Sequence, residues 1–166
     1  MARPIWPVTS REEVGACYDD TFEEVFRFAA RLTGDRRPAE DLVSEAYAEL
    51  VRAGRSGDVT SIGVAWLIVT VRRRFIDGLR SDERARRRLR LIQPRGEELA
   101  APSTVDRSGE LLAPLSERER AAVVLRYVED LPVADVAREL GISVRAAESL
   151  LARARARMRR SEVRDA

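Results

Sequence analysis

The sequence predicts an all-α fold of two small helical domains joined by a flexible linker, with a helix-turn-helix as the C-terminal domain. Wherever the chain shows periodicity, apolar residues recur every three or four positions, and no segment shows a strand signal. Residues 91–114 interrupt the helical pattern with three prolines and two glycines, which is typical of an interdomain linker. We therefore expect an N-terminal tail over residues 1–16, a first domain over 17–90, a linker over 91–114, a second domain over 115–160 and a C-terminal tail over 161–166.

Local sequence signals mark the end of the first helix of the first domain and the start of the second. An apolar stripe runs from Tyr18 to Leu32, and Gly34 follows it as a C-terminal cap. Pro38 suits the first turn of the next helix. That helix is expected to bury an apolar stripe beside an acidic ridge. The stripe is Leu42, Val43, Ala46, Tyr47, Leu50 and Val51, and the ridge is Asp41, Glu45 and Glu49.

The third helix of the first domain is expected to be amphipathic, with a core face and a charged face. The core face should hold Val64, Leu67, Ile68, Val71, Phe75 and Leu79, and the opposite face Trp66, Thr70, Arg73, Asp77, Arg80 and Arg84.

The second domain is expected to contain three helices, over residues 117–128, 133–140 and 144–160. Ser116 and Glu119 have the spacing of a capping box. Gly141 should break the second helix from the third, and Ser143 is a good N-cap for the third. A short helix, a tight turn and a longer helix with outward arginines form a helix-turn-helix, whose second helix can enter the major groove of DNA.

Charge placement indicates a polyanion partner. The net charge is only +2, but all 30 basic residues are arginine, and many gather in two blocks, at residues 72–90 and 153–160. The chain has no histidine and a single cysteine, Cys17. These counts exclude an internal disulfide, a zinc site of the usual Cys/His kind and a histidine-based triad. We expect no catalytic residue, no metal and no cofactor.

The sequence also favours a cytoplasmic location. Its longest apolar run, residues 65–71, is far shorter than the roughly 20 residues that a membrane-spanning helix needs. The N-terminus MARPIWPVTS lacks the apolar region of a signal peptide.

Two motifs resemble regions two and four of the extracytoplasmic-function (ECF) sigma factors. The stretches TGDRRPAEDLVSEAYAEL and AWLIVTVRRRFIDGLRSDERARRR are similar to region two, and LSERERAAVVLRYVEDLPVADVARELGISVRAAESLLARARARMRR to region four. The resemblance covers about residues 17–160. It implies a protein that binds core RNA polymerase and directs it to promoter DNA, opening the minus-ten element with region two and reading the minus-thirty-five element with region four. An anti-sigma factor is a further candidate partner.

The resemblance also implies roles for three groups of residues. One group would bind core polymerase, one would hold the melted minus-ten strand, and one would read the minus-thirty-five duplex. The polymerase group is Glu40, Asp41, Glu45, Tyr47 and Glu49; the minus-ten group is Trp66, Arg72, Arg73, Arg74, Asp77, Arg80 and Arg84; the minus-thirty-five group is Ser143, Arg145, Ala146, Glu148, Ser149, Arg153 and Arg155.

Several positions depart from the family pattern. Arg73 stands where asparagine is usual and cannot repeat the donor–acceptor pair of an amide. Glu148 stands where a basic residue is usual and could accept a hydrogen bond from cytosine N4. Leu150 stands where arginine is usual, and Trp66 suits a core position as well as a base contact.

Two other classes of protein remain open. One is a helix-turn-helix transcriptional repressor with a dimerising N-terminal bundle. The other is a sigma-like protein that acts mainly through protein partners.

Overall fold

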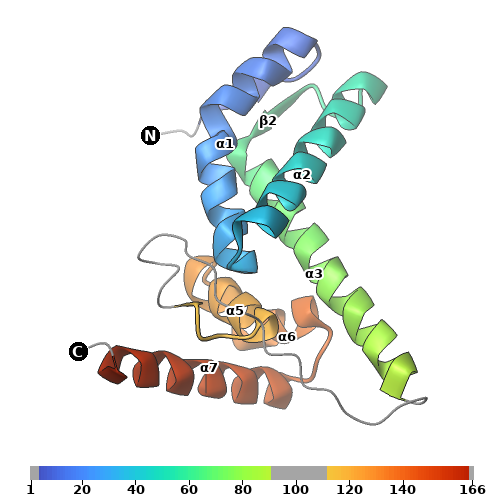
Figure 1. The fold of residues 1–166 in the computed structure, drawn as a ribbon. Helices are drawn as coiled ribbons and strands as arrows, with labels where there is room; N and C mark the ends of the chain where they lie inside the picture. The colour runs from blue at the N-terminus through green and yellow to red at the C-terminus, as the bar shows by residue number, and fades with distance from the viewer. Residues whose placement is uncertain (1–3, 91–111, 165–166) are drawn as a thin grey trace.

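The computed structural model describes residues 4–90 and 112–164, and these are almost entirely helical (Figure 1). The all-α expectation is confirmed, with two helical domains. The first domain contains α1 (Arg11–Thr33), α2 (Arg36–Ser56) and α3 (Val64–Arg90), and the second contains α5 (Glu117–Val123), η1 (Val124–Val128), α6 (Val133–Leu140) and α7 (Val144–Arg164). Among the described residues, no helix combines the length and apolarity needed to cross a membrane.

A small sheet corrects the expectation that the chain contains no strand. Strands β1 (Ile5–Pro7) and β2 (Ser61–Gly63) pair antiparallel, with Trp6 opposite Ile62. Strands of three residues are too short to show the alternation by which strands are found in a sequence. Because β2 leads directly into α3, the sheet ties the N-terminal residues to the start of that helix.

The first helix begins earlier than expected, inside the predicted N-terminal tail. Ser10 and Glu13 form a capping box in which the Glu13 N–H donates to Ser10 Oγ at 3.2 Å and the Ser10 N–H donates to Glu13 Oε2 at 3.0 Å. These reciprocal bonds satisfy N–H groups that the first helical turn leaves without partners. The Ser-x-x-Glu spacing of residues 10–13 is the local signal that marks this start.

The second domain has the expected helix-turn-helix. Gly141 ends α6 with a left-handed φ of 64°, which glycine adopts without strain. The Ala146 N–H donates to Ser143 Oγ at 3.2 Å, which confirms Ser143 as the N-cap of α7. Ser116 and Glu119 form the expected capping box of α5. Two details differ: the predicted helix over residues 117–128 widens into the π-helical η1, and α7 runs past residue 160 to Arg164.

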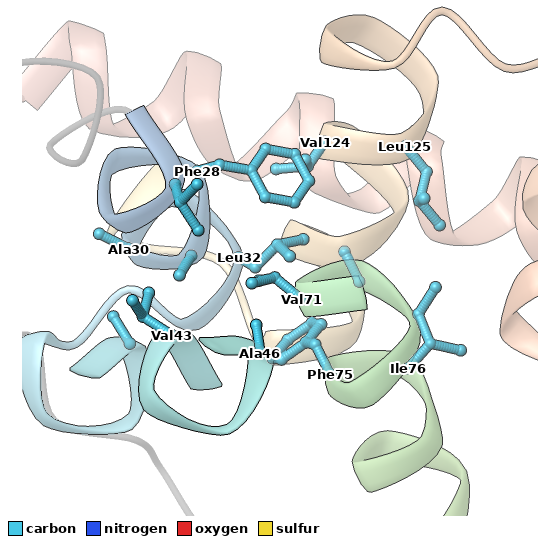
Figure 2. Packing of buried hydrophobic residues seen from close by; sticks show 14 of the residues in the cluster. Phe28, Ala30, Leu32, Val43, Ala46, Val71, Phe75, Ile76, Val124 and Leu125 are labelled. Carbon is cyan, nitrogen blue, oxygen red and sulfur yellow. The ribbon is translucent and has the colours of Figure 1, made fainter. Parts of the chain in front are cut away.

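The two domains pack against each other, which the sequence did not predict. Phe28 and Leu32 of α1 and Val71 of α3 share one apolar cluster with Val124 and Leu125 of η1 (Figure 2). Figure 1 shows α5 and α6 lying between α7 and the helices of the first domain. Most of the expected linker lies outside the described residues.

Arg120 is a deeply buried charged link between the domains. Its side chain extends from α5 to the C-terminal end of α1, where Nη1 donates to the carbonyl of Thr33. Nη2 donates to the carbonyl of Leu115 at 3.1 Å, and the residue is only 6 % exposed. Burial lowers the pKa of the guanidinium. A cation at this end of a helix is favoured by the unpaired carbonyls and the helix dipole.

Replacing Gly34 by alanine should cost more stability than the same change at Gly57. Both glycines are left-handed, with φ of 71° and 78°. Each alanine should therefore cost about 1–2 kcal/mol of backbone strain. A Cβ at Gly34 would also overlap the guanidinium of Arg120, whereas a Cβ at Gly57 meets nothing within 4 Å. The guanidinium must then leave the Thr33 carbonyl, at an extra cost of about 1–2 kcal/mol.

Urea denaturation of both variants measures this difference. Repeating the pair in an Arg120→Ala background should remove the excess cost at position 34. Equal costs for Gly34→Ala and Gly57→Ala in the wild-type background would contradict the contact.

Candidate functional site

The acidic ridge of α2 divides into a part that faces solvent and a part that pairs with α3. Glu40 and Asp41 are exposed near the start of the helix, and Glu40 pairs with Arg36 at 2.7 Å. Further along, Glu45 and Glu49 accept from Arg74 at 2.9 and 2.7 Å. Glu40, Asp41 and Glu45 therefore face solvent, whereas Glu49 is partly buried against α3.

Glu49 links α2 to two arginines of α3. It accepts hydrogen bonds from both Arg73 and Arg74. Partial burial acts to raise the pKa of Glu49, but the hydrogen bonds from the two guanidinium groups outweigh it and hold the pKa below its ordinary value. Glu49 is thus an ionised carboxylate that fixes α3 beside α2.

Tyr47 lies inside the first domain and not on the acidic surface where it was expected to bind polymerase. The residue is 7 % exposed, and its hydroxyl lies 2.6 Å from Oγ1 of Thr21 on α1. Burial, opposed in part by this hydrogen bond, raises the pKa of Tyr47 to about 12. Its ring also contacts Tyr18, with centroids 4.8 Å apart. Tyr47 therefore supports the acidic ridge by holding α2 to α1.

The expected minus-ten residues point in several directions from α3. Arg73 and Arg74 reach α2, as described above. Arg72 reaches the second domain, where Nη1 lies 3.1 Å from Oε2 of Glu129. Arg80 also reaches the second domain, and Nη2 donates to the carbonyls of residues 138, at 2.9 Å, and 139. The arginines expected to form one DNA surface are thus divided among protein partners.

The remaining minus-ten positions lie on both sides of the surface boundary. Asp77 and Arg84 are exposed, and Asp77 is 3.9 Å from Arg80. Trp66 is partly buried and packs against the core. Thr70, expected on the charged face, is buried; its hydroxyl donates to the Trp66 carbonyl at 2.9 Å and so needs no water.

The exposed surface of α7 gathers the expected minus-thirty-five residues. The exposed residues are Arg145, Ala146, Glu148 and Ser149 in its first turns, and Arg153 and Arg155 further along. The hydroxyl of Ser143 is engaged in capping the helix, so this residue positions the others. The arrangement presents polar groups at the helix N-terminus and arginines behind them.

Leu150 is buried in the second domain, 7 % exposed. Its departure from the family pattern therefore removes no side chain from the outward face of α7. Arg153 and Arg157 both approach Glu119, at 3.9 and 3.5 Å from its Oε1. Glu119 is itself 2 % exposed, so the capping box of α5 also holds the middle of α7.

Sequence reasoning missed three residues that join the domains or build the second one: Glu119, Arg120 and Glu129. Glu119 carried a signal, its capping-box spacing, but nothing in the sequence indicated its contact with α7. Arg120 and Glu129 carried none, because their partners, Thr33 and Arg72, are 87 and 57 positions away along the chain.

Cys17 lies in an environment that suits packing and not redox sensing. It is fully buried on α1, and its sulfur lies 4.0 Å from Oγ1 of Thr21. Burial raises the pKa of the thiol, which lowers the fraction of reactive thiolate. This environment favours a structural role.

Comparison with known proteins finds similarity to sigma factors over both domains. The family model of Sigma-70 region 2 matches residues 18–85, and that of Sigma-70 region 4 matches residues 109–158. The ECF RNA polymerase sigma factor SigL of Mycobacterium tuberculosis is 32% identical over 143 residues, which are 77% of this chain and 76% of SigL. The ECF RNA polymerase sigma factor BldN of Streptomyces coelicolor is 31% identical over 157 residues, covering 84% of this chain and 56% of BldN.

A solved structure is similar in fold. It is the sigma factor RpoE of Bartonella quintana in complex with the anti-sigma factor NepR, with a TM-score of 0.51 and 21% sequence identity. The match covers 93% of this chain and 99% of that one.

Proposed function

Because the chain belongs to the ECF family of RNA polymerase sigma factors, we propose that α2, α3 and α7 divide its contacts among core polymerase, the minus-ten element and the minus-thirty-five element. The chain is an alternative sigma factor that directs RNA polymerase to specific promoters. We call the domain of α1–α3 region two and the domain of α5–α7 region four. The observation that carries the division is the placement of charge: exposed acids on α2, arginines on α3, and a polar and basic outward face on α7.

The exposed N-terminal end of the acidic ridge is the proposed polymerase contact. Asp41 is exposed there, one helical turn from Glu45. Glu49 and, in part, Glu45 are neutralised by arginines of α3, so they contribute less charge to an outside partner. Tyr47 supports this surface from within. Asp41 is therefore the residue that the proposal depends on most.

Replacing Asp41 by arginine should weaken binding to core polymerase by at least roughly tenfold, since it puts a like charge where a close charge pair is proposed. The measurement is co-purification with core polymerase across a concentration series, with circular dichroism to check helicity. Asp58→Arg is the matched control, because Asp58 is exposed beyond the other end of α2. If Asp41→Arg co-purifies with core polymerase as wild type does, Asp41 is not a polymerase contact.

The exposed charges of α3 are proposed to track the melted minus-ten strand. Arg84 is exposed, and Arg73 keeps more than half of its side-chain surface exposed beside Glu49. Guanidinium groups bind backbone phosphates without regard to sequence. Because Arg73 replaces the usual asparagine, we expect it to hold the backbone and to leave base selection to other groups. Trp66, partly buried in the core, would contribute through the part of its ring that remains accessible.

The outward face of α7 is proposed to read the minus-thirty-five duplex. Its N-terminal residues would meet base edges, and the arginines behind them would meet phosphates. Glu148 is exposed among these residues, and a carboxylate there repels phosphate. Glu148 could offset this repulsion by accepting a hydrogen bond from cytosine N4.

Replacing Glu148 by alanine should relax selection at one position of the minus-thirty-five element. The preference for cytosine there should fall by roughly 1–3 kcal/mol, because alanine cannot accept a hydrogen bond from cytosine N4. The measurement is transcription from a promoter library with this element randomised. Arg155→Ala is the comparison, and it should weaken all promoters about equally, as removal of a phosphate-binding group does. If wild type and Glu148→Ala select the same bases at every position, Glu148 reads nothing.

The proposed partners follow from the family. They are core RNA polymerase and promoter DNA, with an anti-sigma factor as a candidate regulator, since the related RpoE was solved with NepR. We expect the protein to act in the cytoplasm, where the polymerase is. A helix-turn-helix repressor would leave the acids and arginines of region two without a role.

A further inference from the structure

We infer that Arg72 and Arg80 have two competing partners, region four of the same chain and the phosphates of promoter DNA, so that the free protein is held closed by the side chains it later uses on DNA. This inference rests on the proposed function, because the second partner is the minus-ten strand. The first partner is visible in the structure.

The pair of Arg72 with Glu129 is the first of the closing contacts. The two side chains are only 18% and 21% exposed, and their charged atoms lie 3.1 Å apart. Partial removal from water strengthens their attraction relative to an exposed pair. Glu129 engages Nη1 of Arg72, so a phosphate oxygen can bind this nitrogen only by taking the place of the carboxylate.

Arg80 makes the second closing contact, at the C-terminal end of α6. It donates to the carbonyls of Arg138 and Glu139, which belong to the last turn, where the helix supplies few partners of its own. The helix dipole favours a cation in the same place. A Cβ placed on Gly141 would lie 3.5 Å from Nε of Arg80. Arg80 therefore sits at the turn of the helix-turn-helix itself.

The contacts are reciprocal between the two domains. Arg80 of region two binds the last carbonyls of α6 in region four, and Arg120 of region four binds the last turn of α1 in region two. Each domain thus supplies an arginine that caps a helix of the other. These two caps, the ion pair of Arg72 with Glu129 and the shared apolar cluster all hold the same closed arrangement.

The shared apolar cluster limits which partners can separate the two domains. Separating the domains exposes Val124 and Leu125 of η1 together with Phe28 and Val71 of region two (Figure 2). Promoter phosphates can replace the polar partners of Arg72, but they cannot cover this apolar surface. A protein surface can, so opening should accompany binding to core polymerase. The free chain should bind DNA weakly.

Glu129 gives a direct test, because it closes the protein and is not a proposed DNA or polymerase contact. Glu129→Arg places two guanidinium groups together and should favour the open form. Asp130→Asn is the control, since the neighbouring Asp130 pairs with Arg126 inside region four, at 3.3 Å. Asparagine also tolerates the positive φ of 53° at that position. The charge swap Arg72→Glu with Glu129→Arg restores the pair in reverse.

The first measurement is the radius of gyration of the free full-length chain by small-angle X-ray scattering. Glu129→Arg should be larger than wild type, while Asp130→Asn and the charge swap should match wild type. Circular dichroism checks that the helices are kept. If Glu129→Arg has the dimensions of Asp130→Asn, or if the charge swap stays as expanded as Glu129→Arg, the closing role of this pair is overturned.

The second measurement is binding of the same free proteins to a single-stranded oligonucleotide of randomised sequence. Glu129→Arg should bind roughly threefold to tenfold more tightly than wild type because Arg72 is released. That variant also adds a positive charge, so Glu129→Gln must show a change in the same direction. No change in either variant would overturn the competition for Arg72.

The outcome separates this inference from the proposed function. With saturating core polymerase, Glu129→Gln should transcribe like wild type, since the pair is absent from the open form. If wild type itself gives no promoter-specific transcript, the proposed function fails, whereas the scattering result still decides whether the free chain is closed by Arg72 and Glu129.

Discussion

Helix α3 contacts both domains at once, and the other features of the structure depend on how its side chains are divided between them. One side of the helix is buried in region two through residues such as Leu67 and Val71. The rest carries arginines, some of which bind α2 while others bind region four. The three consecutive arginines at 72, 73 and 74 illustrate this division. Successive residues of a helix point about 100° apart, so Arg72 reaches region four while Arg73 and Arg74 reach α2.

The helices, and the caps that end them, could be predicted because their signals are local. Gly34, Gly141, Ser116 and Ser143 all act at the expected helix ends. The strands were missed because they are too short to show periodicity. The packing between domains was missed for a different reason. An arginine in a sequence looks the same whether it will bind phosphate, a carboxylate or the carbonyls at a helix end, and the partner of Arg80 lies 58 positions away.

The placement of the candidate site could be predicted from the sequence better than its partners. The outward residues of α7 are exposed as expected, and Asp41 is exposed on α2. Five of the arginines expected to meet DNA already contact protein groups: Arg72, Arg73, Arg74, Arg80 and Arg153. The proposed function therefore includes a change of partners. For Arg72 and Arg80, the contacts with region four would have to be given up before the same groups could hold a promoter.

If α3 leaves region four for DNA, its neighbours around position 80 must change from the end of α6 to the promoter, and cross-linking from this position detects that change. A photoreactive amino acid in place of Arg80 would be activated first in the free protein and then in a complex with core polymerase and a promoter that the protein transcribes. We expect a cross-link to residues around Gly141 in the free protein and to a promoter strand in the complex. A cross-link to region four in both states would show that α3 keeps this neighbour and would overturn the exchange.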